Sequence, residues 1–194
     1  MKKVSMLLLI AASALAFQAC NERTKSEKEN AEQAEAATDA ASEANDTLAT
    51  VDQNDADFAM KASAGGLLEV ELGKLAQQKS ASAKVKEFGA MMEKDHTQAN
   101  DKLKAIADAK SIILPGRLDE SGQKHFDELS KLSGKEFDKK YINLMVDDHE
   151  EDLKLFNKAA QDAKDPDLKN FATDVSGKVQ EHLNHVKQLK SSLK

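Results

Sequence analysis

Four long stretches of the chain place apolar residues three and four positions apart, which is the period of one face of an α-helix. They cover residues 55–78, 80–110, 135–163 and 165–193. Ser80 or Ser82 fits the N-cap of the second stretch, and Asp165 followed by Pro166 fits the start of the fourth. The apolar stripes within them span roughly 23 to 28 residues, which corresponds to helices about 35–42 Å long at 1.5 Å per residue. The pattern therefore predicts four helices of matched length.

The connections indicate how these helices are arranged. Helices one and two, and likewise three and four, are joined by short connections and should form antiparallel pairs. About 25 residues separate helices two and three, enough to return along the whole bundle. Pro115 and Gly116 interrupt this connection, and a short amphipathic piece ending at Gly134 follows. We predict an all-α, ferritin-like four-helix bundle with a long crossover, containing a short helix, between helices two and three.

The first 54 residues lack this periodicity. Lys2 and Lys3 precede a short apolar run that ends at Cys20, so residues 1–19 resemble a lipoprotein signal peptide that would leave a lipid on Cys20. A plain secretory signal cleaved nearby is the alternative, and both export the chain. Residues 20–54 contain few large hydrophobes and are predicted to form a flexible, Ala/Glu-rich tether, with the bundle domain at 55–194.

The expected location is the cell envelope. Asn21 is not an Asp, which argues against retention in an inner membrane and favours an outer-membrane lipoprotein, with its domain in the periplasm or at the surface. Its membrane partner would be reached through the lipid on Cys20. The chain carries a net charge of −6, which disfavours nucleic acid as a partner. A homo-oligomer or an envelope protein partner stays open.

One ionisable residue interrupts the apolar stripe of each helix near its middle. Helix by helix, these are Glu69, His96, His149 and His182. Mid-helix positions lie at one level in a bundle of matched helices, so the four side chains should converge. Carboxylates and imidazoles that project inward from facing helices are how bundle cores hold transition metals.

Further polar residues flank these four positions. Glu93 is a fifth candidate ligand because it lies three residues before His96. Candidates for orienting the imidazoles are Asp95, Asp148, Asp152, Glu181, His185 and Tyr141. The alternative interpretation is that each His is an ordinary core residue and that "DDHEED" is a solvated acidic face. Burying several unpaired ionisable groups costs a few kcal/mol each, which favours one shared site.

Several motifs carry a resemblance to a known family. "GGLLEVELGKLA", "VKEFGAMMEKDH", "SGKEFDKKYINLMVDDHEEDLKLF" and "EHLNHV" resemble the bacterial envelope family called domain of unknown function 4142, over about residues 55–192. The resemblance implies a ferritin-like fold and a location in the cell envelope. It does not imply any particular activity.

The comparison with di-iron ferritin-like proteins is partial. Glu69 and the pair Glu93 and His96 fit the Glu and Glu-x-x-His pattern of those proteins. His149 stands where a Glu is expected, and Glu181 directly precedes His182. This donor set suits one zinc, iron, copper or nickel ion better than an oxygen-activating pair of irons.

These observations favour binding or storage of a transition metal in the envelope. Two alternatives stay open. The first is a structural or interaction module whose polar cluster is not a metal site, and the second is a redox or hydrolytic metalloenzyme. No catalytic motif decides whether the protein is an enzyme.

Overall fold

The structure is a computed structural model that describes residues 15–192. Within that range the regular secondary structure is helical, without a β-strand. The helices are α1 (Leu15–Leu48), α2 (Gln53–Lys79), α3 (Ala83–Ala109), α4 (Glu120–Ser130), α5 (Gly134–Asp162) and α6 (Pro166–Ser192).

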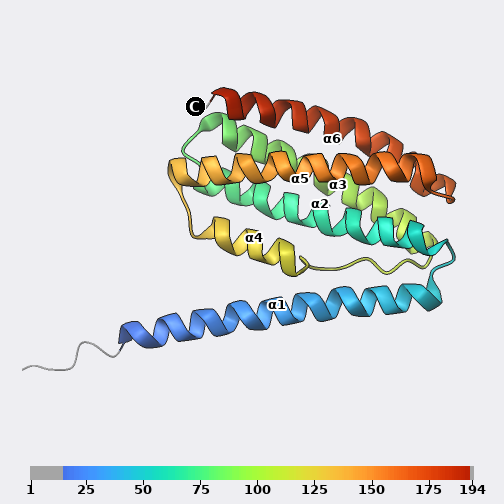
Figure 1. The fold of residues 1–194 in the computed structure, drawn as a ribbon, viewed down its shortest axis with the longest axis horizontal. Helices are drawn as coiled ribbons and strands as arrows, with labels where there is room; N and C mark the ends of the chain where they lie inside the picture. The colour runs from blue at the N-terminus through green and yellow to red at the C-terminus, as the bar shows by residue number, and fades with distance from the viewer. Residues whose placement is uncertain (1–14, 193–194) are drawn as a thin grey trace, which may run out of the picture.

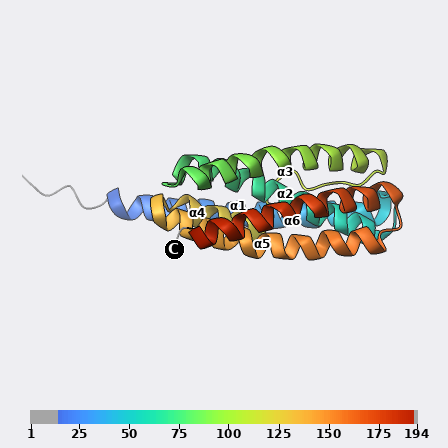
Figure 2. The ribbon, with the colours of Figure 1, turned by 90° about the horizontal axis from the view of Figure 1, so that it is seen from above.

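Helices α2, α3, α5 and α6 form the four-helix bundle (Figures 1 and 2). The pairs α2–α3 and α5–α6 are antiparallel hairpins, and residues 110–133 return along the length of the bundle before α5 begins. Helix α4 lies within this return segment. The predicted ferritin-like bundle, with its long crossover and short helix, is confirmed.

The helix boundaries follow from local capping. The Ser82 side chain accepts a hydrogen bond from the backbone N of Val85, at 3.4 Å, and so caps α3. The Asp165 side chain accepts from the backbone N of Leu168 at 3.0 Å, which caps α6 directly before Pro166. Ser80 instead ends α2.

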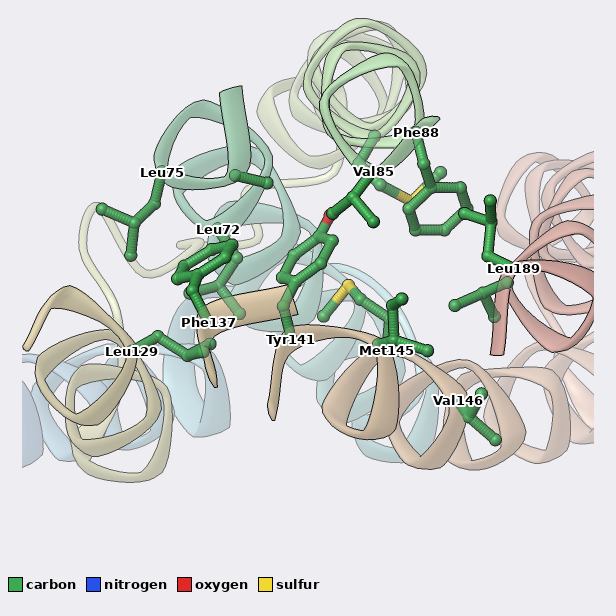
Figure 3. Close-up of a cluster of buried hydrophobic side chains, with 14 of the residues drawn as sticks. Leu72, Leu75, Val85, Phe88, Leu129, Phe137, Tyr141, Met145, Val146 and Leu189 are labelled. Carbon is green, nitrogen blue, oxygen red and sulfur yellow. The ribbon is translucent and has the colours of Figure 1, made fainter. Parts of the chain in front are cut away.

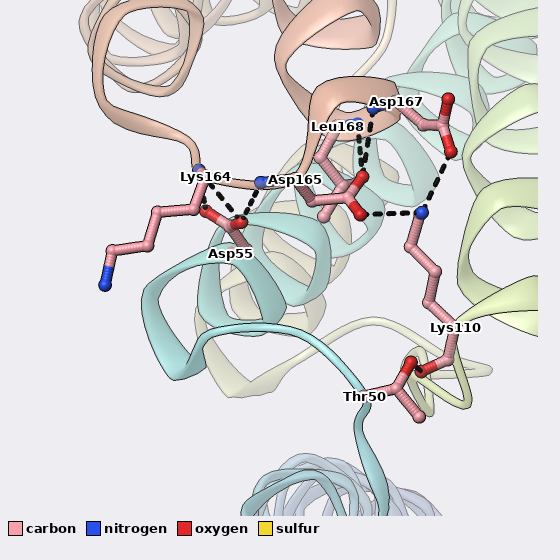
Figure 4. Close-up of polar contacts among 7 residues, drawn as sticks. All are labelled: Thr50, Asp55, Lys110, Lys164, Asp165, Asp167 and Leu168. Carbon is pink, nitrogen blue, oxygen red and sulfur yellow. Dashed lines mark hydrogen bonds and ion pairs between the residues drawn. The ribbon is translucent and has the colours of Figure 1, made fainter.

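Polar contacts join the three chain segments that meet at one end of the bundle (Figure 4). The buried Asp55 carboxylate, on α2, accepts hydrogen bonds from the backbone N atoms of Lys164 and Asp165 in the α5–α6 connection. Lys110, at the end of α3, lies 2.7 Å from the Asp165 carboxylate and 2.8 Å from that of Asp167. These contacts align the ends of the two hairpins.

Helix α1 lies alongside α4 and the crossover (Figure 1). This differs from the flexible tether predicted for residues 20–54, because residues 15–48 are helical. Among the α1 side chains that the structure describes, the buried ones are those of Ala34, Ala41 and Asn45 rather than large hydrophobes, and such residues leave no strong apolar stripe in the sequence. The Asn45 side chain also exchanges two hydrogen bonds with the backbone of Ile113, of 3.0 and 2.7 Å.

The core consists of two hydrophobic clusters, one toward each end of the bundle. Figure 3 shows the first, in which Tyr141 packs with Phe88, Phe137 and Met145. The second is built around residues such as Phe58, Leu103, Phe156 and Phe171. On α3, α5 and α6 the segment between the two clusters contains a buried histidine, so a polar layer divides the core.

Helices α2 and α3 approach one another closely at a pair of glycines. A Cβ atom built on Gly73 would lie 2.6 Å from the carbonyl oxygen of Gly89, and one on Gly89 would lie 2.8 Å from the Gly73 oxygen. Only glycine fits at such a separation of two backbones. No helix among the described residues is long and apolar enough to cross a membrane.

Candidate metal centre

The polar layer contains one ionisable side chain from each bundle helix. Glu69 comes from α2, His96 from α3, His149 from α5 and His182 from α6, and all four are at least 94% buried. Each replaces an apolar residue on the inward stripe of its helix. The four residues that the periodicity predicts to converge are thus all buried in one layer of the core.

The three imidazoles lie against one another. Ring centroids are 5.8 Å apart for His96 and His149, 5.3 Å for His96 and His182, and 5.6 Å for His149 and His182. One nitrogen of each ring lies within 4.8 Å of the corresponding nitrogens of the other two. Three nitrogens at this spacing could surround a single ion.

Carboxylates lie next to one nitrogen of each ring. Glu69 Oε2 is 2.7 Å from His96 Nδ1, and Glu69 Oε1 is 3.2 Å from His149 Nδ1. Asp95 Oδ2 lies 3.0 Å from His182 Nε2. A carboxylate against one ring nitrogen favours the proton on that nitrogen and leaves the other nitrogen as a lone-pair donor.

Several buried polar atoms of this layer have no hydrogen-bond partner. They include Nε2 of His96, Nε2 of His149 and Nδ1 of His182, which are the ring nitrogens away from the carboxylates. Glu69 lies close to His96 and His149, but these contacts are not aligned as hydrogen bonds. Both oxygens of Glu69 are therefore also buried without a hydrogen-bond partner. Buried polar groups in native proteins are nearly always paired. These nitrogens and oxygens would be paired by one ligand that accepts several lone pairs, such as a metal ion.

The electrostatics of the layer favour neutral imidazoles. Burial lowers the pKa of His96 to about 4 and that of His182 to about 4. Burial, helped by the neighbouring His96 and His182, lowers the pKa of His149 to about 3. Burial, and secondarily the charge of Asp148, raises the pKa of Glu69 well above its usual value. All three rings therefore present metal-binding lone pairs at neutral pH.

Some predicted residues lie away from the imidazoles. The sequence predicts Glu93 as a ligand, but its carboxylate instead accepts a hydrogen bond of 2.6 Å from Gln77 Nε2, on α2. It does not lie in the group formed by the three His side chains. Glu181 is exposed and pairs with Lys178 at 2.7 Å. His185 is exposed and packs edge-on against Phe88. Residues three positions from a buried His lie on nearly the same face of its helix. A small rotation of the helix then decides whether such a side chain points into the polar layer or beside it.

Tyr141 is fully buried in the first hydrophobic cluster, two turns before His149 on α5. Its ring stacks on Phe137 with centroids 5.5 Å apart, and its hydroxyl has no hydrogen-bond partner. Burial, with a contribution from the charge of Glu69, raises its pKa. It lies among apolar side chains, so we assign it to packing rather than to orienting an imidazole.

Asp148 and Asp152 lie on α5 beside His149 and line a surface pocket between α2, α4 and α5. Burial raises the pKa of Asp148 to about 6. Burial, with the charges of Glu69 and Asp148, raises the pKa of Asp152 well above its usual value. The pocket also contains Asp119 and His125 from the α4 region. No pattern in the sequence links Asp119 with the site, because its position depends on the path of the crossover.

Of residues 1–20, the structure describes only a helical backbone from Leu15 onward, and the Cys20 side chain is not described. The predicted signal peptide therefore falls mainly outside the described residues.

Comparison with solved structures gives several similar folds. A DUF305 fragment from Deinococcus radiodurans superposes with a TM-score of 0.64 at 12% identity, over 73% of this chain and 98% of that one. CopM in its Cu(I)-bound form gives 0.61 at 15% identity, over 71% and 96%. A predicted secreted DUF305 protein from Streptomyces coelicolor gives 0.62 at 15% identity, over 72% and 93%. At these identities the likeness concerns the fold.

Two sequence comparisons complete the picture. No curated protein sequence matches the chain. A family model, described as a domain of unknown function (DUF4142), matches residues 37–189, from within α1 almost to the end of α6. The match includes all four residues of the polar layer, and the chain belongs to the DUF4142 family.

Proposed function

We propose that this protein binds one transition-metal ion through His96, His149 and His182. One observation carries the proposal: three buried imidazoles lie so that one nitrogen of each ring is within 4.8 Å of a nitrogen of the other two, and each ring has a nitrogen without a hydrogen-bond partner. The donors would be Nε2 of His96, Nε2 of His149 and Nδ1 of His182. Three buried imidazoles with unpaired nitrogens are costly in an apolar core unless a ligand pairs with them.

The carboxylates then act on the imidazoles rather than on the ion. Glu69 faces Nδ1 of both His96 and His149, and Asp95 faces Nε2 of His182. Such contacts fix the tautomer and orientation of each ring and raise its basicity. Glu69 thus supports two ligands at once, in place of the direct coordination expected from the sequence.

The donor set selects the class of metal. Three imidazoles suit zinc, copper, nickel or iron, whereas magnesium and calcium prefer oxygen ligands. That CopM, a protein of similar fold, has a Cu(I)-bound form supports a metal of this class. Three protein ligands leave a coordination position open, which suits reversible binding and transfer of an ion.

The site of action would be the cell envelope. We propose export through residues 1–19 and lipid attachment at Cys20, with the bundle held outside the inner membrane. The predicted secreted DUF305 protein of similar fold supports export. Mass spectrometry of the purified N-terminal peptide tests this. A diacylated Cys20 that disappears in Cys20→Ser supports the anchor, and a chain that retains Met1 excludes export.

Metal titration of the chelator-stripped protein tests the metal site. Zn²⁺ and Cu²⁺ should each bind with a stoichiometry of one, and His149→Gln should weaken binding at least 100-fold. His185→Gln is the matched control, because His185 is exposed and outside the cluster, and should bind like the wild type. Equal binding by wild type and His149→Gln, or no binding by either, excludes the metal site. The polar layer would then serve the structure alone.

A further inference from the structure

A surface pocket of about 380 Å³ opens between α2, α4 and α5. Its wall includes Gly65 from α2, Asp119 and His125 from the α4 region, and Asp148 and Asp152 from α5. The pocket therefore lies on the face of the bundle that the crossover covers.

The lining of the pocket is acidic. Four carboxyl groups, from Asp119, Asp148, Glu151 and Asp152, stand against one amine, Lys61. Asp119 is partly engaged, since its Oδ1 accepts a hydrogen bond of 2.7 Å from the backbone N of Gly122. A concave surface lined mainly by carboxyl groups attracts cations and raises their local concentration.

The pocket borders the buried metal centre. Asp148 directly precedes His149, and its Oδ2 atom is buried without a hydrogen-bond partner. Gly65 lies one turn before Glu69, and a Cβ atom at Gly65 would be 3.5 Å from Asp152 Oδ1. Glu69 and His149, which follow these wall residues on α2 and α5, are both fully buried, and the charge of Asp148 contributes to the raised pKa of Glu69. The pocket wall and the polar layer are thus built from neighbouring residues of α2 and α5.

The opposite approach to the imidazoles is less favourable for a cation. There Asp95 is 20% exposed beside His182. Lys178, one turn before His182 on α6, pairs with Glu181 at 2.7 Å. The hydrogen bond with Glu181 raises the pKa of Lys178, and the charge of Asp95 acts in the same direction. This side has two carboxyl groups, those of Asp95 and Glu181, beside the one ammonium group of Lys178, whereas the pocket has four carboxyl groups beside the one amine of Lys61.

We propose that the pocket between α2, α4 and α5 is the entrance through which the metal ion reaches His96, His149 and His182, with Asp148 and Asp152 as its transient ligands. This inference rests on the proposed metal site. The carboxylates hold the ion in the pocket, and the ion then exchanges these oxygen ligands for imidazole nitrogens. Gly65 keeps the passage open, because a larger side chain there would project toward Asp152.

Stopped-flow mixing of the stripped protein with Co²⁺, followed by visible absorbance, measures the rate of loading. In Asp148→Asn/Asp152→Asn the association rate constant should fall at least tenfold at low ionic strength, while one ion still binds at equilibrium. The association rate of the wild type should fall with added salt, and that of the double variant should change much less. Gly65→Leu should slow both loading and release and leave the dissociation constant within about threefold.

The matched control is Asp147→Asn/Asp174→Asn, which removes two exposed carboxylates that do not line the pocket. It should load at the wild-type rate. If the pocket double variant also loads at the wild-type rate while binding one ion, the entrance is wrong and the metal site stands. If the wild type binds no Co²⁺ or Zn²⁺, the metal site is wrong and the entrance falls with it. Circular dichroism of Gly65→Leu shows whether this variant retains the bundle. If it does not, the loading rates of Asp148→Asn/Asp152→Asn and its control decide whether the pocket is the entrance.

Discussion

Glu69 Oε2 lies 2.7 Å from His96 Nδ1, and the other oxygen of the same carboxylate lies 3.2 Å from His149 Nδ1. One side chain on α2 therefore contacts imidazoles from α3 and α5 in the middle of the bundle. This sharing fixes the relative rotation of three helices at the level of the site. On both rings the nitrogen that Glu69 contacts is Nδ1, and Nε2 has no hydrogen-bond partner.

We expect Glu69→Gln to retain a metal stoichiometry of one but to weaken binding about 10- to 100-fold. The amide keeps the shape of the side chain but, unlike the carboxyl group, cannot ionise and so cannot favour a cation and a basic imidazole. Isothermal titration with Zn²⁺ measures the change. Glu71→Gln, which removes a half-buried carboxylate that pairs with Lys74 and does not contact the three imidazoles, should bind like the wild type. Complete loss of binding in Glu69→Gln would instead identify Glu69 as a direct ligand.

The buried imidazoles should make the metal-free fold sensitive to acid. The pKa of His182 is lowered from 6.5 to about 4. A side chain with a lowered pKa in the fold binds its proton first in the unfolded chain, so its contribution to stability is complete above pH 6.5 and is lost as the pH falls toward 4. His96 and His149 act in the same direction, whereas the raised pKa of Glu69 acts in the opposite one.

We therefore expect wild-type protein to lose about 1–2 kcal/mol more stability than His182→Gln between pH 7 and pH 5. Urea denaturation of the metal-free proteins at each pH measures the difference. His185→Gln should follow the wild type, because that side chain is exposed. Parallel pH profiles for wild type and His182→Gln would mean that His182 is already hydrated in the fold.

Much of this architecture follows from the sequence because the bundle depends on periodicity. The level of Glu69, His96, His149 and His182 could be predicted from their places on four apolar stripes. The rotation of Glu93 could not, because Gln77 on a different helix decides it. The acidic pocket depends on the path of residues 110–133, which no local pattern specifies.

The pattern of apolar residues does not predict helix α1, for a related reason. Alanine stripes pack helices closely without a strong hydrophobic signal, and the decisive partner of Asn45 is a backbone 68 positions away. A pattern of large apolar residues detects neither kind of contact.

The hydrogen bonds of Asn45 to Ile113 should hold α1 in place. We expect Asn45→Ala to weaken this attachment by about 1–3 kcal/mol, because the Ile113 backbone N and O lose their partners. Hydrogen exchange should speed up in residues 28–48 and stay unchanged in α5 and α6. Thr47→Ala is the control, since the Thr47 hydroxyl is exposed and bonds only within its own helix. Faster exchange throughout the bundle would show that α1 is part of the cooperative core.

The glycine pair between α2 and α3 should be intolerant of a single methyl group. In Gly73→Ala the new Cβ would lie 2.6 Å from the Gly89 carbonyl oxygen and 2.9 Å from the Glu93 backbone N. Both neighbours are backbone atoms of α3, so the helices must move apart, and we expect a loss of about 1–3 kcal/mol in the free energy of unfolding. Gly177→Ala is the matched control, because no atom lies within 4 Å of a Cβ at this exposed position in α6. There the better helix propensity of alanine should stabilise the protein by about 0.5–1 kcal/mol. Urea denaturation of both variants measures these opposite shifts, and equal stabilisation by the two would mean that α2 and α3 are not in close contact at Gly73.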